Sequence, residues 1–177
     1  VYVKMNAPCG VSHAKTDLKK LCEELDVTFH EKVIEIDAPR TSECFWCSWN
    51  KRKTLFNSCK EYGCNKLALG HHKDDIVETY LLNLFYHGQI ATMPPKLDFF
   101  DGKLTMIRPL AYMEETMSGR YAEEHGFIPV SCSKEFFNTT QRSMVKNLIA
   151  DLKKSIPKVK SNLFNSLRKE IDQEYIL

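Results

Sequence analysis

The sequence predicts an α/β fold built on a three-layer, mostly parallel sheet. Apolar, strand-like runs alternate with helical patterns along the chain, and this alternation is typical of βα units. The 177 residues are enough for one domain with a substantial core. Hydrophobic residues make up 43% of the chain and charged residues 27%, which are ordinary values for a globular protein.

The first half of the chain shows strand patterns separated by helical ones. The expected elements are strands over 1–6, 28–36 and 66–70 and helices over 15–25 and 45–62. Gly63 ends the second helix, because glycine commonly follows the last helical residues. The first helix has its apolar residues on one stripe, which places Cys22 in the core; the stripe consists of Leu18, Leu21, Cys22 and Leu25.

The second half continues the alternation and ends in helices. The expected elements are a helix over 72–87, a loop with Pro94 and Pro95, a strand or extended connection over 104–110, a helix over 112–125 and a strand over 127–131. From about residue 138 the pattern is helical, with an interruption at Pro157. We therefore predict an α/β domain over 1–137 and a C-terminal helical extension over 138–177.

Titratable side chains gather where the third strand meets its helix, in the segment GHHKDD at 70–75. Ligands of parallel sheets bind at the carboxyl ends of strands, and Gly70 marks such an end. At 100° per residue, one side of the helix carries polar groups, namely His71, Asp74, Asp75 and Glu78. The opposite side is apolar and is expected to pack on the sheet: Ile76, Val77, Tyr80, Leu81 and Leu84.

Two interpretations of this junction compete. Aspartates in a first helical turn stabilise the helix dipole, but this does not explain two adjacent histidines. Alternatively, the outward-facing groups form a nucleotide and metal site, in which carboxylates hold Mg²⁺ while a histidine and backbone N–H groups contact phosphate.

Cysteines form a second candidate site. Cys44 and Cys47 make a C-x-x-C motif at the start of the helix expected over 45–62. Thiols at i and i+3 on a helix share a face. A redox dithiol, a zinc site and an iron–sulfur cluster are all compatible with the pair. Cys132 follows the predicted strand 127–131 and is the best third ligand, whereas Cys59 and Cys64 flank a helix end and are expected to be structural.

Charge and cysteine usage narrow the class of protein. The net charge of +2 is small, but residues 142–177 carry eight Lys/Arg against four Asp/Glu, and a second basic cluster, Lys51, Arg52 and Lys53, follows the C-x-x-C. Such clusters are either solvated helix faces or contacts to nucleic acid.

Seven cysteines without a secretory signal indicate a reducing compartment and a cytoplasmic location. No segment approaches the length of apolar chain that a membrane span needs.

Three stretches in order resemble the tRNA 2-thiocytidine synthetase (TtcA-like) family of the PP-loop ATP-pyrophosphatase superfamily. They are TSECFWCSWNKRKTLF, then LALGHHKDDIVETYLLNLFYHG with MPPKL, then IRPLAY followed by Cys132. The resemblance covers nearly the whole chain and implies an adenine nucleotide alpha hydrolase-like, Rossmann-like fold. The superfamily's SGGxDS loop is absent from the chain, and VYVKMNAPCG resembles the family's second strand, so an N-terminally truncated version of that fold is expected.

The resemblance also implies a reaction and its cofactors. Enzymes of this family adenylate a base carbonyl in the tRNA anticodon loop with ATP and Mg²⁺ and then replace the oxygen with sulfur. By motif, Cys44, Cys47 and Cys132 would hold a [4Fe-4S] cluster, with Cys44 and Cys132 as the catalytic cysteines. The nucleotide site would comprise Gly70, His71, Asp74 and Asp75, and Lys51, Arg52 and Lys53 would contact tRNA.

The implied partners are tRNA and a sulfur donor, either a cysteine desulfurase or sulfide, and the expected assembly is a homodimer. Two alternatives stay open. One is a tRNA lysidine synthetase-like enzyme, which needs no cluster. The other is an iron–sulfur or zinc module that binds RNA without ATP chemistry, which the missing SGGxDS loop favours.

Overall fold

The computed structural model describes residues 1–6, 17–35, 43–127 and 140–174, and for residues 6, 43–45 and 168–174 it describes the backbone only. The chain divides into two units, Val1–Leu67 with Arg120–Lys134 and Ala68–Gly119 with Glu135–Leu177. The predicted strand over 127–131, apart from its first residue, and the predicted boundary at 137–138 lie outside the described residues. None of the helices in the described ranges is long and apolar enough to cross a membrane.

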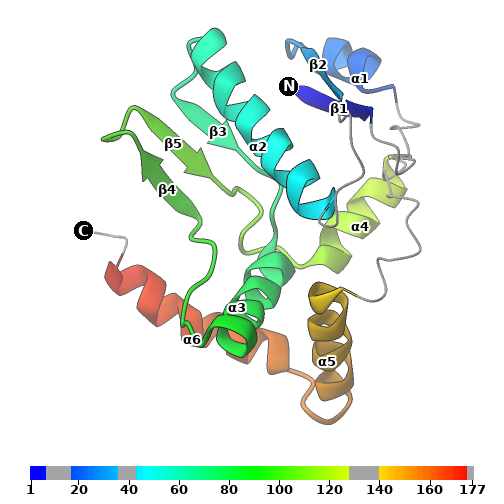
Figure 1. The fold of residues 1–177 in the computed structure, drawn as a ribbon. Helices are drawn as coiled ribbons and strands as arrows, with labels where there is room; N and C mark the ends of the chain where they lie inside the picture. Colours follow the sequence, from blue (N-terminus) through cyan, green and yellow to red (C-terminus); the bar gives the residue numbers. More distant parts are fainter. Residues whose placement is uncertain (7–16, 36–42, 128–139, 175–177) are drawn as a thin grey trace. The chain divides into compact units, whose positions relative to one another are not determined.

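The first unit contains the parallel strand pair that the sequence predicts. Strand β1 (Tyr2–Asn6) pairs in parallel with β2 (Glu31–Glu35), starting from Tyr2 opposite Glu31. Helices α1 (Leu18–Glu24) and α2 (Glu43–Glu61) belong to the same unit, and α2 packs on β1 (Figure 1). Gly63, with φ of 65°, follows the end of α2 as expected.

The predicted apolar stripe on the first helix is confirmed for Leu18, Leu21 and Cys22, which are the less exposed residues of α1, but its burial in the core is wrong. Helix α1 is only seven residues long and contains no buried residue. Cys22 is half-buried rather than part of the core, and Leu25, which is 65% exposed, is the C-cap. The helix begins late because Asp17 is its N-cap, with a side chain that accepts a hydrogen bond from the Lys20 N–H.

A second sheet has the strand order β3–β5–β4. Its strands are β3 (Lys66–Ala68), β4 (Lys96–Phe99) and β5 (Leu104–Ile107). Strands β4 and β5 pair antiparallel, with Lys96 opposite Ile107. Strand β4 falls where a loop with Pro94 and Pro95 was expected, because the four-residue alternation of KLDF is too short to mark a strand without its partner. The turn between the two strands has positive φ at Phe100, Asp101 and Gly102.

Helices α3, α5 and α6 of the second unit pack against one another (Figure 1). They span Lys73–His87, Gln141–Ser155 and Val159–Glu174, so the predicted interruption at Pro157 is confirmed. Their contact surface is the hydrophobic core of this unit, made of Ile76, Val77, Leu81, Ala111, Val145, Ile149, Phe164 and Leu167. A further helix, α4 (Glu115–Glu124), begins next to α3. The C-terminal helices therefore cover α3 directly, which decides where its polar residues point.

Candidate functional site: the start of helix α3

A histidine caps helix α3. His72 is the N-cap residue, and its Nδ1 accepts a hydrogen bond of 3.4 Å from the Asp75 N–H. In return, Asp75 Oδ2 accepts a hydrogen bond of 2.9 Å from the His72 N–H. This reciprocal pair is a capping box, with imidazole in place of the usual hydroxyl. It accounts for one of the two histidines that capping by aspartate left unexplained. His71, the other one, is half-buried in the turn that precedes the helix.

Asp74 is buried, with 4% of its surface exposed, and each of its carboxylate oxygens has a partner. Oδ1 accepts from the Lys160 ammonium group of α6, and Oδ2 accepts a 2.9 Å hydrogen bond from the Glu115 N–H at the start of α4. Burial alone raises the pKa of Asp74, but these two donors together outweigh burial and lower the pKa below its usual value. Asp74 is therefore a carboxylate that stays ionised although it is buried.

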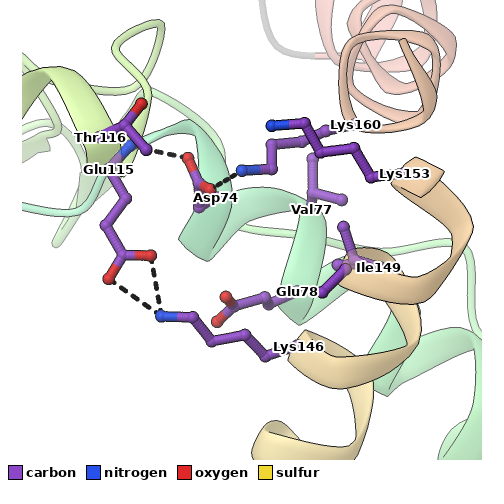
Figure 2. A pocket seen from close by; sticks show the side chains of 10 residues that line it. Asp74, Val77, Glu78, Glu115, Thr116, Lys146, Ile149, Lys153 and Lys160 are labelled. Atoms are coloured by element: carbon purple, nitrogen blue, oxygen red, sulfur yellow. Dashed lines mark hydrogen bonds and ion pairs between the residues drawn. The ribbon is translucent and has the colours of Figure 1, made fainter. Parts of the chain in front are cut away.

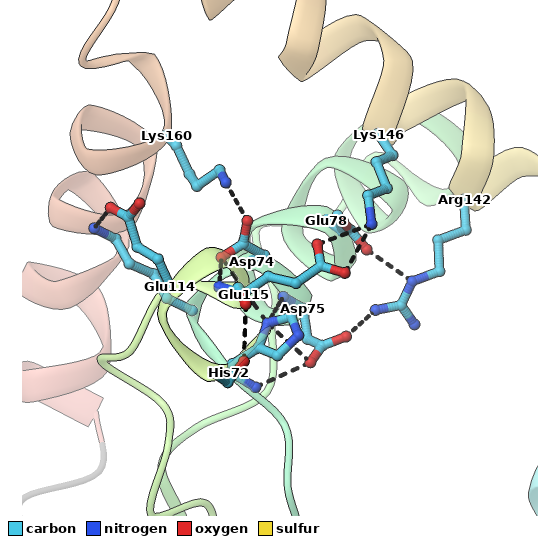
Figure 3. Close-up of polar contacts among 11 residues, drawn as sticks. His72, Asp74, Asp75, Glu78, Glu114, Glu115, Arg142, Lys146 and Lys160 are labelled. Atoms are coloured by element: carbon cyan, nitrogen blue, oxygen red, sulfur yellow. Dashed lines mark hydrogen bonds and ion pairs between the residues drawn. The ribbon is translucent and has the colours of Figure 1, made fainter. Parts of the chain in front are cut away.

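Arg142 of α5 bridges two acids of α3 (Figure 3). One of its terminal nitrogens contacts Asp75 Oδ1, and its Nε donates a 2.8 Å hydrogen bond to Glu78 Oε2. Glu78 is only 5% exposed. The planar guanidinium group suits this arrangement, because it presents several donors in a fixed fork.

A cavity of about 190 Å³ lies beside these ion pairs (Figure 2). Lys146 contacts both oxygens of Glu115 at 3.0 and 2.8 Å on one side of it, and this ion pair raises the pKa of Lys146. The lining combines acids, lysines and an apolar surface, namely Asp74, Val77, Glu78, Glu115, Thr116, Lys146, Ile149, Ala150, Lys153 and Lys160.

The prediction that the acidic side of α3 faces outward is wrong for Asp74 and Glu78. Both are buried, and their partners come from the C-terminal helices. Ile76, Val77 and Leu81 are buried as predicted, but they pack in a core with α5 and α6. Leu84 was also expected to be packed and is 37% exposed. Arg142, Lys146 and Lys160 were not predicted as part of this site, because their only signal in the sequence is the excess of basic residues over 142–177.

Carboxylates bind cations, and in this structure Asp74 and Asp75 each contact a positively charged side chain. Among the described residues, no three His, Cys, Asp or Glu side chains form a group that could hold a metal ion. The two aspartates are thus a pair of adjacent carboxylates whose four oxygens already have donors.

The cysteine site is only partly covered by the described residues. Cys44 and Cys47 both lie on α2, three residues apart, and Cys47 is half-buried. The side chain of Cys44 and the whole of Cys132 lie outside the described part of the chain, so the predicted convergence stays a prediction. Cys59 is buried, with a pKa that burial raises, and Cys64 is exposed.

The basic cluster after the C-x-x-C lies on α2. Arg52 and Lys53 are exposed, and Lys51 is half-buried. Lys53 Nζ lies 5.1 Å from the centroid of the Trp49 ring, which is itself 43% exposed. A cation over an exposed aromatic ring is an arrangement that can meet both the phosphates and the bases of a nucleic acid.

Comparison with known proteins supports the motif-based resemblance, although no family model matches the chain. A tRNA-cytidine(32) 2-sulfurtransferase from Syntrophotalea carbinolica is 44% identical over 131 residues, which cover 73% of this chain and 51% of that protein. The enzyme of the same name from Geobacter sulfurreducens is 40% identical over 156 residues, covering 86% of this chain and 60% of that protein. The chain thus spans about half the length of the curated relatives it matches.

A solved structure confirms the fold class. The U34-tRNA thiolase NcsA from Methanococcus maripaludis, determined with its [4Fe-4S] cluster, matches with a TM-score of 0.68 and 21% identity, over 96% of this chain and 60% of that one. Sequence similarity and fold agree: over about half of their length the chain is similar to the tRNA-cytidine(32) 2-sulfurtransferases, and it shares the α/β fold of the tRNA thiolase.

Proposed function

We propose that this protein takes part in ATP-dependent thiolation of a cytidine in the anticodon loop of tRNA. The observation that carries the proposal is the 40–44% identity to enzymes named tRNA-cytidine(32) 2-sulfurtransferase. The structural neighbour, a tRNA thiolase, supports it at the level of the fold. An anticodon-loop base is unpaired and can enter a protein pocket, which suits this kind of chemistry.

The start of α3 is the proposed nucleotide site, with Gly70, His71, Asp74 and Asp75 as its residues. Gly70 and His71 directly precede the helix, where the helix dipole favours phosphate. Asp74 and Asp75 would contribute negative charge that favours Mg²⁺ at this site, while their oxygens keep the donors described above. ATP supplies the chemistry that turns a base carbonyl oxygen into a leaving group, and the protein's part is to orient the phosphates and balance their charge.

The cysteines Cys44, Cys47 and Cys132 are the proposed ligands of a [4Fe-4S] cluster, with Cys44 and Cys132 taking part in sulfur transfer. Spacing on α2 supports the first two, because residues three apart on a helix share a face. When bound, such a cluster with three protein thiolates supplies an iron that has no protein ligand.

Lys51, Arg52 and Lys53 are the proposed tRNA contacts. In the C-terminal helices, by contrast, many cations already contact carboxylates of the protein: Arg142, Lys146, Lys154 and Lys160. Within the described side chains of that region, much of the positive charge is thus paired internally, and the cluster on α2 is the better candidate for phosphate. The remaining proposals are a homodimer, a cytoplasmic location, and a cysteine desulfurase or sulfide as sulfur donor.

Anaerobic purification followed by iron and sulfide analysis tests the cluster, and ATP-dependent formation of 2-thiocytidine in a tRNA transcript, detected by mass spectrometry of nucleosides, tests the reaction. Cys47→Ala is expected to abolish both, while Cys64→Ala, at an exposed cysteine beyond the end of α2, leaves both unchanged. A colourless protein that contains zinc and binds tRNA without turning over ATP would favour the RNA-binding module instead.

A further inference from the structure

The carboxylates of Asp74 and Asp75 are held in the same way. One oxygen of each accepts a backbone N–H, from Glu115 for Asp74 and from His72 for Asp75. The other oxygen contacts a cation of the C-terminal helices, Lys160 for Asp74 and Arg142 for Asp75. One of the two partners of each carboxylate therefore lies far along the chain, 86 positions from Asp74 and 67 positions from Asp75.

These contacts differ from ordinary surface ion pairs in the burial of their acids. Arg142 itself is 47% exposed, but the side chains of its partners Asp75 and Glu78 are only 18% and 7% exposed. The side chains of Lys160 and Asp74 are 18% and 5% exposed, whereas those of the Lys154–Asp151 pair on α5 are 77% and 70% exposed. An exposed pair contributes little, because water screens it and two long side chains must be ordered. A buried carboxylate that loses its partner is left with uncompensated charge. Lys160 and Arg142 thus fix the direction of the two carboxylates.

We propose that Lys160 and Arg142 are positioning residues of the nucleotide site, acting through Asp74 and Asp75. This inference rests on the proposed nucleotide site and adds to it two residues from outside the GHHKDD segment. Arg142 also holds Glu78, so it fixes two acids one helical turn apart (Figure 3). Without these cations, each carboxylate would keep one backbone donor and could rotate about it.

The test compares Lys160→Met and Arg142→Met with Lys154→Met, in the purified protein. Each of the three changes removes one positive charge from α5 or α6. A general effect of net charge on the affinity for ATP is therefore the same in all three variants. The readout is the dissociation constant of Mg·ATP by calorimetry. We expect affinity to fall at least about tenfold for the first two variants, the usual size for loss of a supporting partner, and to stay within about twofold for the control. Affinity equal to that of the control, or tighter Mg·ATP binding, would overturn the proposal.

A second measurement needs no ATP. Amide hydrogen exchange at Glu115 is expected to speed up in Lys160→Met, and exchange at His72 in Arg142→Met, because the acceptor carboxylate of each N–H is released. Unchanged exchange would show that the cations do not hold the carboxylates. If the wild-type protein binds no ATP while exchange changes as expected, the proposed nucleotide site fails but the restraint stands. Lys160→Arg keeps the positive charge beside Asp74 and should bind Mg·ATP more tightly than Lys160→Met. Arg142→Met, with its exchange readout at His72, carries the test if Lys160→Met does not fold.

Discussion

Adjacent residues of α5 provide a matched test of how the C-terminal helices pack. Ile149 is 6% exposed and belongs to the core with α3 and α6, whereas Leu148 is 37% exposed. Substitution by alanine removes three carbons from either side chain. For Ile149→Ala, transfer contributes about 2.4 kcal/mol at ~0.8 kcal/mol per carbon, and the cavity left behind brings the loss of unfolding free energy to roughly 3–4 kcal/mol. For Leu148→Ala, we expect about 1 kcal/mol, because the side chain is partly in water already.

The assay is urea and thermal unfolding of both variants beside the wild type. A difference of about 2 kcal/mol corresponds to roughly 4–8 °C in Tm for a chain of this size. Helix propensity works against this order of losses, because replacing isoleucine by alanine gains more helix propensity than replacing leucine by alanine. Equal losses for the two variants would refute the packing described for α5. A separate early transition in Ile149→Ala alone would show that α5 unfolds independently of α3.

Three further predictions concern backbone, acid and thiol behaviour. Gly88 caps α3 with φ of 63°, so Gly88→Ala should lower the free energy of unfolding in urea by about 1 kcal/mol. Gly119 lies within α4 and faces open space, so Gly119→Ala should raise that free energy by roughly 0.5–1 kcal/mol. A change of the same sign in both variants would contradict this. Because its partners lower the pKa of Asp74, its ionised form stabilises the fold above the unfolded pKa of about 3.9 and this contribution is lost as pH falls through the lower folded value. Between pH 5 and pH 3, roughly the range over which such carboxylates titrate, Asp74→Asn should therefore lose less stability than the wild type. Urea unfolding at each pH measures this, and an unchanged pH dependence in the variant would count against the buried ion pair. Burial raises the pKa of Cys59, so iodoacetamide should label Cys64 well before Cys59 in peptide mass spectrometry; faster labelling of Cys59 would disagree with its burial.

Local patterns predicted most of the helices and strands, because periodicity and stop signals act within a few residues. The span of α3 and its end before Gly88 follow from such signals, as does the break at Pro157. The short strand β4 did not, since its pairing with β5 decides it. Likewise, the stripe on α1 had the right period for burial but belongs to a helix too short to bury any residue.

The residues of the candidate nucleotide site stay a prediction, whereas the outward orientation predicted for its acids is wrong for Asp74 and Glu78. The motif GHHKDD marked the start of α3, and the angular positions of its acids were read correctly as one face. Which surface covers that face depends on Arg142 and Lys160, and nothing near the motif indicates them. The sequence showed those cations only as an excess of charge, which is equally compatible with a surface for RNA.

The long separation between Asp74 and Lys160 has a consequence for synthesis. Ribosomes add about 5–20 residues per second, so the lysine arrives some ~4–17 s after its carboxylate, given the 86 positions between them. During that interval Asp74 stays hydrated, and its burial must wait for α6. Helix α6 therefore completes the environment of a motif that was translated long before it, and this region reaches its final packing only after α6 has been made.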